Sequence, residues 1–189
     1  GDTTPTFTGT AEASSTVELF AGSSSLGTTT ADSSGNWSLT VDSSEAFSEA
    51  SYAITAKATD VAGNVSDASA SLSITTDTST AIPSTPDLAP SSDTGNSNTD
   101  NITGDTTPTF TGTAEASSTV ELFAGSSSLG TTSVDSSGNW SFTVDSSKAF
   151  SDGSYAITAK ATDAVGNVSN ASSALTLIVD KASPVITSE

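Results

Sequence analysis

Apolar and polar residues alternate with a period of two along most of the chain, in short runs bounded by Gly, Asn, Asp or Ser. In the run Trp37-Ser-Leu39-Thr-Val41, large apolar side chains fall on one face and small polar ones on the other. This alternation is typical of β-strands with one buried and one solvated face. It predicts strands at residues 5–10, 16–20, 36–41, 51–59 and 71–75. No window has apolar residues at helical spacing, so the sequence predicts an all-β protein.

The strand pattern occurs twice. A shift of 103 residues aligns Gly1 with Gly104 without a gap, and 62 of the 77 residue pairs up to Asp77 and Asp180 are identical. A fixed period is the signature of a repeat array. Several short strands separated by turns over ~100 residues are typical of a β-sandwich, so we expect two sandwiches in tandem.

The two copies of the repeat differ in length. We predict an amino-terminally truncated repeat at residues 1–80, a complete repeat at 81–183 and the start of a further repeat at 184–189, which makes the chain a piece of a longer array. Residues 78–103 are rich in Pro, Ser, Asn and Asp, and this composition predicts a linker followed by an irregular loop.

The amino-acid composition excludes several functional classes of protein. The chain has 22 acidic and 4 basic residues, a formal net charge of −18, and neither Cys nor His. Zinc fingers, Ser-His-Asp triads, Cys proteases and disulfide frameworks all need one of the missing side chains. Nucleic acid is excluded as a partner because four lysines cannot form a basic stripe. No transmembrane run, signal peptide or lipidation motif is present, so we expect no membrane insertion of this segment.

An enzymatic function is not expected. The acid pair of a glycoside hydrolase is the one catalytic chemistry that the composition allows. However, the sequence has no insertion long enough to form a cleft, and its longest irregular stretch is the predicted linker. Trp37 and Trp140 alternate with Leu39 and Phe142, so we interpret both as core residues rather than as sugar-stacking platforms.

The placement of aspartates is the strongest functional signal. Asp77 ends the last strand of the first copy, and Asp60 and Asp163 open an Asp-x-x-Gly-Asn loop. The predicted linker and the loop after it contain Asp87, Asp93, Asp100 and Asp105. In a sandwich, the loop before the last strand lies at the pole where the chain enters, so we expect Asp77 to approach Asp163. Ca²⁺ suits such clustered oxygens, because it takes six to eight ligands in flexible geometry. Mg²⁺ fits less well because it prefers strict octahedra.

A simpler interpretation stays open beside the calcium hypothesis. Asp and Asn are common in turns because their side chains hydrogen-bond nearby backbone groups, and surface acids also serve solubility. Local density favours calcium, since two carboxylates about 4 Å apart repel by about 4 kcal/mol at an effective dielectric of 20. The run from Asp93 to Gly104 is no EF-hand, because it lacks the glycine and glutamate that this motif needs at its sixth and twelfth positions.

Several motifs carry a family resemblance. They are Thr107-Pro-Thr-Phe-Thr-Gly-Thr-Ala-Glu115, Thr119-Val-Glu-Leu-Phe123, Asp135-Ser-Ser-Gly-Asn-Trp-Ser141, the run from Gly153 to Asn167, and a lead-in with Pro86-Asp-Leu88, Ser92-Asp-Thr-Gly95 and Asp100-Asn-Ile-Thr103. Together they closely resemble the bacterial Ig-like repeats of giant surface adhesins. The resemblance covers all of the second copy and what is present of the first. It implies tandem Ig-like sandwiches of Greek-key topology with about seven strands each.

The resemblance also implies a function. The chain is similar to the extender region of large, secreted RTX-type adhesins, which are biofilm-associated proteins on the surface of Gram-negative bacteria. In that family, repeats bind Ca²⁺ at and near domain junctions and hold a ligand-binding region away from the cell. Carried over by position, the metal ligands are Asp77, Asp163, Asp93, Asp100 and Asp105, with Asp60, Asp2 and Asp180 as their counterparts. The glycine-rich nonapeptide repeat of such proteins is absent from this segment.

Two functions from different classes therefore remain. The first is a monomeric spacer whose partners are the neighbouring repeats of the same chain, made rigid by Ca²⁺. The alternative is a Ca²⁺-dependent module that itself binds a glycan or protein, with two copies providing avidity. Short serine-rich loops without a cluster of aromatic residues favour the spacer.

Overall fold

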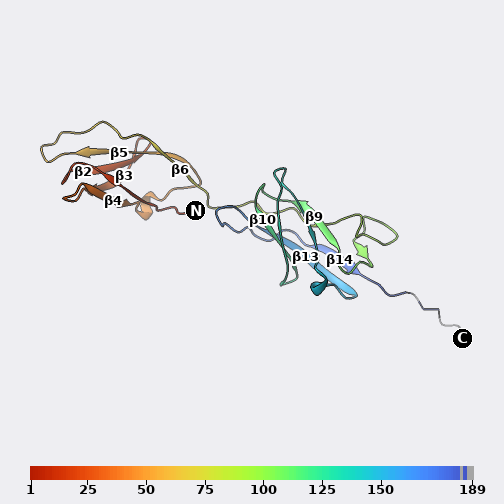
Figure 1. The fold of residues 1–189 in the computed structure, drawn as a ribbon. Coiled ribbons are helices and arrows are strands. Elements are labelled where there is room, and N and C mark those ends of the chain that lie inside the picture. Colours follow the sequence, from red (N-terminus) through yellow and green to blue (C-terminus); the bar gives the residue numbers. More distant parts are fainter. Residues whose placement is uncertain (184, 187–189) are drawn as a thin grey trace. The chain divides into compact units, whose positions relative to one another are not determined.

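The protein forms two compact units, which we describe separately. The computed structural model describes residues 1–183 and 185–186. Unit 1 is Gly1–Thr78 and unit 2 is Ser79–Glu189 (Figure 1). The repeat limits at residues 80 and 183 stay predictions, and the predicted third repeat involves residues 184 and 187–189, which lie outside the described residues.

Unit 1 is a sandwich of two antiparallel sheets. One sheet pairs β1 with β4, and the other has the order β3-β2-β5-β6. The strands are β1 (Thr6–Thr10), β2 (Thr16–Ala21), β3 (Ser24–Thr30), β4 (Asn36–Thr40), β5 (Ala50–Thr59) and β6 (Leu72–Thr76), with one 3₁₀ turn, η1 (Ser43–Glu45). The inward positions of these strands supply a thin core that includes Phe7, Val17, Leu19 and Ile54. Alternation therefore places the large apolar side chains between the sheets.

Unit 2 has the same sandwich with two further short strands. Its strands are β7 (Asp87–Leu88), β8 (Ile102–Thr103), β9 (Thr109–Thr113), β10 (Thr119–Ala124), β11 (Ser127–Ser133), β12 (Asn139–Thr143), β13 (Gly153–Thr162) and β14 (Leu175–Val179), with a 3₁₀ turn η2 (Ser146–Lys148). The sheets have the orders β12-β9-β7 and β11-β10-β13-β14-β8. The pair β14 and β8 is parallel, and the other pairs are antiparallel. The tandem β-sandwich fold that the sequence predicts is confirmed.

The strand predictions agree with the structure except where side chains give little alternation. Strands β1, β2, β4, β5 and β6 match the predicted segments within a residue or so at each end. Strand β3 was not predicted, because Leu26 is its one large apolar residue. The prediction of a linker over residues 78–103 is wrong for its central part. There Pro83, Pro86, Leu88 and Ala89 are buried in unit 2, because this segment lies along β9 as an edge strand.

The buried core differs between the two units although their sequences are so similar. Trp140 is 3% exposed in unit 2, as expected for a core residue, whereas its counterpart Trp37 is half-buried.

Lys57 and Lys160 are exposed on the outer face, as the alternation of their strands predicts. Phe123, which is out of phase with its neighbours, lies under Lys160, whose Nζ is 5.9 Å from the ring centroid.

The turn between β3 and β4 depends on a glycine. Gly35 has a φ of 82°, and a Cβ at this position would lie 2.6 Å from the backbone oxygen of Ala11. We expect Gly35→Ala to lower the free energy of unfolding of unit 1 by at least about 2 kcal/mol, because strain adds to a clash. Gly22→Ala is the matched control. Gly22 has a φ of 61°, but a Cβ at this position would have no atom within 4 Å, so we expect a loss of unfolding free energy of about 1 kcal/mol from the backbone strain alone. Urea unfolding measures both values, and equal losses would contradict the clash.

Candidate metal centre

The predicted ligands of unit 2 lie at two opposite poles. Strand β13 leads toward Asp163, and its other end pairs with the end of β14, where Gly153 lies opposite Val179. Asp180 follows β14 directly, and its backbone N–H donates to the oxygen of Thr103 at 2.9 Å. Asp180 therefore lies with β8 at one pole and Asp163 at the other. The chain enters unit 2 at the Asp163 pole, where Thr80 Oγ1 donates to Glu115 at 2.9 Å, in the turn between β9 and β10.

Asp93 is a buried carboxylate at the β8 pole of unit 2. It is 4% exposed, and its Oδ2 accepts from the backbone N–H of Asn101 at 3.2 Å. Its Oδ1 is buried without a hydrogen-bond partner. Asn101 has a φ of 61°, which is a left-handed backbone conformation. Strand β8 begins at the next residue, Ile102. A buried carboxylate oxygen without a partner is costly, so the pole of unit 2 has an uncompensated acceptor.

Two residues after Asp93, the loop forms a small cradle of oxygen atoms around Gly95. A Cβ at Gly95 would lie 3.0 Å from the backbone oxygen of Ile102, 3.8 Å from that of Ser97 and 3.9 Å from Asp100 Oδ1. Carbonyl and carboxylate oxygens are the ligands that Ca²⁺ takes in proteins. The donor chemistry of the loop therefore fits this ion.

Asp105 belongs to a hydrogen-bond network that fixes the loop to β9. Its Oδ2 accepts from Ser92 Oγ at 3.0 Å, and its Oδ1 accepts from the N–H of Thr107 at 2.9 Å. Buried Thr103 donates through Oγ1 to the backbone oxygen of Ser92 and accepts from the N–H of Asp105 at 2.9 Å. Because these partners satisfy both oxygens of Asp105, its role in the structure is to hold the loop in place.

The carboxylates of Asp60 and Asp163 close their own loops. Asp163 Oδ1 accepts from the N–H groups of Val165 at 2.9 Å and Asn167 at 2.8 Å, and its Oδ2 accepts from Asn167 Nδ2 at 2.7 Å. Asp60 makes the same set with Ala62 and Asn64. Burial acts to raise the pKa of Asp163, but the hydrogen bonds from Asn167 and Val165 outweigh it and bring this pKa below its usual value. These contacts are what the turn-forming interpretation expects.

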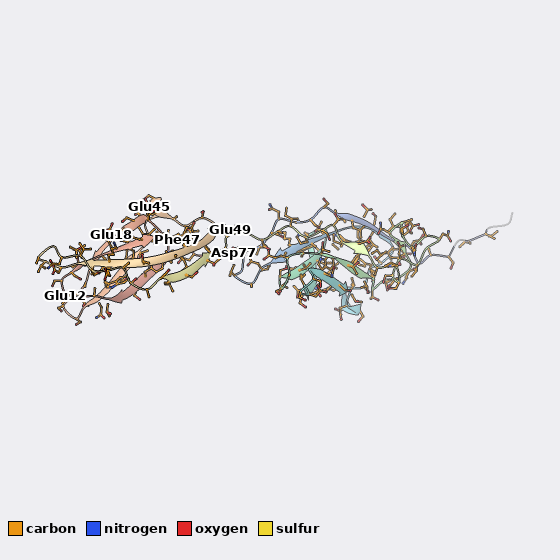
Figure 2. All side chains as sticks on the ribbon, turned by 90° about the horizontal axis from the view of Figure 1, so that it is seen from above. Glu12, Glu18, Glu45, Phe47, Glu49 and Asp77 are labelled. Atoms are coloured by element: carbon orange, nitrogen blue, oxygen red, sulfur yellow. The ribbon has the colours of Figure 1, made fainter. Side chains whose placement is uncertain are left out.

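Unit 1 carries its remaining predicted ligands at the end opposite Asp60. Strand β5 begins at Ala50, opposite Thr76 at the end of β6, and Gly1 packs against the backbone oxygen of Asp77. Glu49 is at the same end, where its Oε2 accepts from Thr78 Oγ1 at 3.3 Å. Figure 2 shows Glu49 and Asp77 together there, and Glu12 at the far end of the unit. Asp2 next to Gly1 caps the local turn by accepting from the N–H of Thr4 at 2.9 Å.

The predicted ligands are thus brought to common poles but not to a common point. Within residues 1–183 and 185–186, no three acidic side chains are grouped so as to hold a metal ion. A complete site would therefore need backbone carbonyls as well as carboxylates. Sequence reasoning missed the contributions of Gly95, Asn101 and Thr103, because neither a backbone oxygen nor a left-handed residue has a reliable signal in one sequence.

Within residues 1–183 and 185–186, no helix is long and apolar enough to cross a membrane.

The comparisons with known proteins show the family. The model of the bacterial Ig-like domain matches residues 1–78 and 79–181. The chain therefore belongs to the bacterial Ig-like domain family, and it contains two such domains. No curated protein matches the chain.

Two similar solved structures come from bacterial adhesins, and a third comes from titin. The chain is 28% identical to a Ca²⁺-stabilized adhesin that helps an Antarctic bacterium reach out and bind ice, with a TM-score of 0.54 over 94% of this chain and 44% of that one. It is 25% identical to a structure concerned with host cell surface retention of a 1.5-MDa bacterial ice-binding adhesin, with a TM-score of 0.50 over 94% and 58% of the two chains. Titin domains A168–A170, at 10% identity and a TM-score of 0.52 over 93% and 59%, share the fold alone.

Proposed function

We propose that the chain is a structural spacer of a bacterial surface adhesin, in which tandem Ig-like domains stiffened by Ca²⁺ hold a ligand-binding region away from the cell. Family membership and the similarity to two adhesins support a structural rather than a catalytic role. The chain spans 44% and 58% of the lengths of these two relatives, so the activity of the whole protein is part of the proposal. Location outside the cell, on a Gram-negative surface, is part of it as well.

The calcium part of the proposal rests on the burial of the Asp93 carboxylate. Its buried, unpartnered Oδ1 lies in a loop that also presents the oxygens of Ile102, Ser97 and Asp100 around Gly95. A chain with a net charge of −18 gains nothing from a buried carboxylate unless a cation compensates it. When bound, Ca²⁺ supplies positive charge that offsets the desolvation of this carboxylate. The residues proposed to hold it at this pole are Asp93 and Asp100, with backbone carbonyls of the same loop.

A second set of ligands is proposed between successive repeats. The first segment of unit 2, residues 79–93, is called the lead-in. It starts at the pole of unit 2 where Asp163 lies and where Thr80 contacts Glu115. Asp77 precedes Thr80 by three residues in the sequence. This short separation supports the expectation that Asp77 of one repeat and Asp163 of the next contribute to one junction, with the neighbouring repeats as the partners of each domain. Asp105 stays a proposed ligand, and Asp60, Asp2 and Asp180 stay proposed counterparts in the other copy.

Thermal unfolding of the full chain in millimolar CaCl₂ and in EGTA tests this proposal, with MgCl₂ as the control ion. A ligand at 100 times its dissociation constant adds about 2.7 kcal/mol. We therefore expect Ca²⁺ to raise the melting temperature by roughly 10 °C, and Mg²⁺ to raise it much less. Small-angle scattering should show a larger maximum dimension in CaCl₂ than in EGTA. Identical melting curves and dimensions in the two solutions would leave the aspartates as turn-formers and remove calcium from the proposal.

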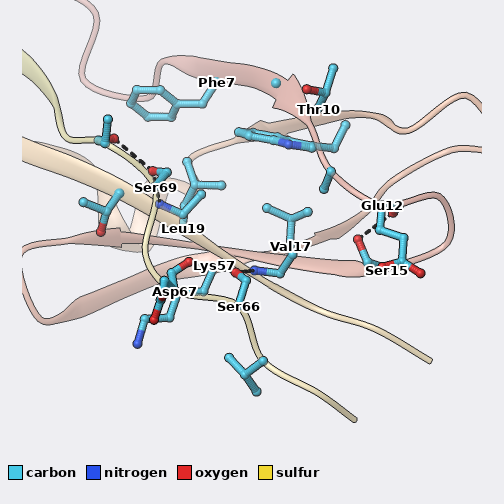
Figure 3. Close-up of a pocket in the computed structure, with 18 of the residues that line it drawn as sticks. Phe7, Thr10, Glu12, Ser15, Val17, Leu19, Lys57, Ser66, Asp67 and Ser69 are labelled. Carbon is cyan, nitrogen blue, oxygen red and sulfur yellow. Dashed lines mark hydrogen bonds between the residues drawn. The ribbon is translucent and has the colours of Figure 1, made fainter. Parts of the chain in front are cut away.

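The alternative of a calcium-dependent binding module has less support. Unit 1 has an open groove of about 760 Å³ (Figure 3), but the corresponding space of unit 2 is occupied by the chain's own residues 82–92. A ligand site repeated in both copies would be open in both. Saturable calcium-dependent binding on a glycan array would reverse this ranking.

A further inference from the structure

The two units carry opposite charges at one position of a shared 3₁₀ turn. The turn η1 ends at Glu45 in unit 1, and the turn η2 ends at Lys148 in unit 2. The residues that cap these turns have almost the same backbone angles, with φ −68° and ψ 150° at Asp42 and φ −67° and ψ 145° at Asp145. The turns therefore place an acid and a base at equivalent positions of the two sandwiches.

In unit 2, the Lys148 ammonium group binds the edge of β11. Its Nζ donates to the backbone oxygens of Ser128 at 3.0 Å and of Leu129 at 3.1 Å. A β-bulge in this edge strand leaves Leu129 without a partner in β10. Hydrogen bonds from Ser147 and the positive charge of Lys148 together bring the pKa of Asp145 below its usual value. A cation thus lies beside two carbonyl oxygens and within electrostatic reach of a carboxylate.

Unit 1 has the equivalent oxygen atoms, with an acid in place of the lysine. The same bulge occurs between β2 and β3, where Ser25 and Leu26 hold the equivalent positions. Asp42 Oδ1 accepts from the N–H of Ser44 at 2.9 Å and from its hydroxyl group at 2.8 Å, whereas Oδ2 accepts no hydrogen bond from the described residues. In that part of the chain, the Glu45 carboxylate also has no hydrogen-bond or ion-pair partner.

The lengths of the two side chains allow a metal ion to take the place of the ammonium group. The carboxylate oxygens of a glutamate are one covalent bond nearer to Cα than the Nζ of a lysine. Ca²⁺ binds oxygen at about 2.3–2.6 Å, so an ion on the Glu45 carboxylate lies about as far from the backbone as Nζ of Lys148. Without a cation, this carboxylate only adds repulsion to oxygens that already carry negative charge.

We propose that unit 1 binds a divalent cation at the place where unit 2 has the Lys148 ammonium group. The ligands are the carboxylates of Asp42 and Glu45 and the backbone oxygens of Ser25 and Leu26. Ca²⁺ is favoured because carbonyl oxygens and irregular geometry suit it, whereas Mg²⁺ needs a near-ideal octahedron. Both carboxylates are exposed, so we expect a dissociation constant of about 0.1–1 mM, as in weak extracellular calcium sites.

This site lies within one unit and goes beyond the proposed function, whose ions bind in the Asp93 loop and between successive repeats. It also contains only two acidic side chains. Half of its protein ligands are backbone oxygens, which have no signal in the sequence. The difference between the copies at residues 45 and 148 is what makes the site visible.

NMR of the ¹⁵N-labelled full chain during titration with CaCl₂ tests the site residue by residue. The amide signals of Leu26 and Glu45 are expected to shift and to saturate, whereas those of Leu129 and Lys148 should not respond. MgCl₂ should produce much smaller shifts. Glu45→Lys is expected to weaken binding at this site at least tenfold, because the new ammonium group takes the place of the ion.

Glu12→Lys is the matched control for the change of charge. It makes the same substitution in the turn between β1 and β2, whereas η1 lies beside the residues that precede β1. This variant should leave the titration of the Leu26 amide unchanged. If the Leu26 amide responds equally in the wild-type chain and in Glu45→Lys, or if its shift does not saturate, the proposal is wrong.

The reverse substitution applies the same test to unit 2. Lys148→Glu supplies the carboxylate that this copy lacks, so calcium-dependent shifts should appear at the Ser128 and Leu129 amides. Residue 148 is exposed, so the sandwich should keep its fold, which the unchanged positions of the other signals verify. Absence of a response at Ser128 and Leu129 in this variant would also overturn the proposal.

The same titration keeps this inference apart from the proposed function. The Asn101 amide, which donates to Asp93, reports on the loop of unit 2. A response at Asn101 without one at Leu26 would overturn the present proposal alone. A response at Leu26 without one at Asn101 would support it and would contradict calcium binding in the Asp93 loop.

Discussion

Replacing Phe110 with alanine is expected to lower the free energy of unfolding of unit 2 by about 3–5 kcal/mol, the usual loss for a fully buried phenylalanine. Phe110 is 0% exposed, and its strand lies between two others, with Leu88 and Phe142 as its partners. Since small domains have stabilities of about 5–15 kcal/mol, this loss is a large fraction of the stability of unit 2. Urea unfolding of the full chain, monitored separately for each unit, measures the loss.

Phe7→Ala is the matched comparison in unit 1. Phe7 holds the same position, but it is 9% exposed and lies beside the open groove. Water already reaches its surroundings, so removing the ring should cost less, about 2–3 kcal/mol. An equal loss at Phe7 and Phe110 would show that the lead-in adds nothing to the burial of this position.

Asp93→Asn is expected to change the stability of unit 2 in opposite directions with and without calcium. In EGTA the melting temperature should rise, because a neutral amide costs less to bury than a carboxylate whose Oδ1 has no partner; we expect a gain of about 1 kcal/mol. In CaCl₂ the variant should lose most of the roughly 2.7 kcal/mol that a saturating ion provides. Calorimetry of both proteins in both solutions gives the four values needed.

Asp87→Asn is the control for this reversal. It removes the same charge from the same lead-in, but Asp87 is exposed on the edge strand β7. Its effect should be small and of the same sign in the two solutions. If Asp93→Asn also behaves in this way, Asp93 is not a calcium ligand, whatever the response of the wild-type chain.

Local patterns were enough to predict most strands and the duplication. Alternation around Trp37 and Tyr52 predicts β4 and β5 because inward positions must be apolar in a sandwich. It failed for β3, where Ser, Thr and Gly give no contrast between the two faces. It also failed for residues 82–92, where three prolines suggest a linker. A proline is compatible with an edge strand, because the outer side of an edge strand needs no hydrogen-bond donor.

The sequence predicts candidate ligands but not how they are arranged, and their role as metal ligands stays a prediction. The sequence directs attention to Asp93 and Asp100 through the density of acids. Their difference is visible only in the structure, where Asp93 is buried and Asp100 is exposed. Asp60 and Asp163 looked equally suitable as ligands, yet their oxygens accept hydrogen bonds from their own loops. Which acid lacks a partner depends on the path of the backbone around it, and one sequence does not specify that path.

The sequence by itself determined an all-β, duplicated and strongly acidic chain, because strand periodicity, repeat length and charge are properties of residue order. Tertiary structure decided how the two nearly identical copies differ. Trp140 is buried and Trp37 is half-buried. A segment distant from Trp140 in the sequence lies along β9, and among the described residues no such segment lies along β1. Burial is a property of everything that packs around a residue, so identical side chains in identical local sequence acquire different environments.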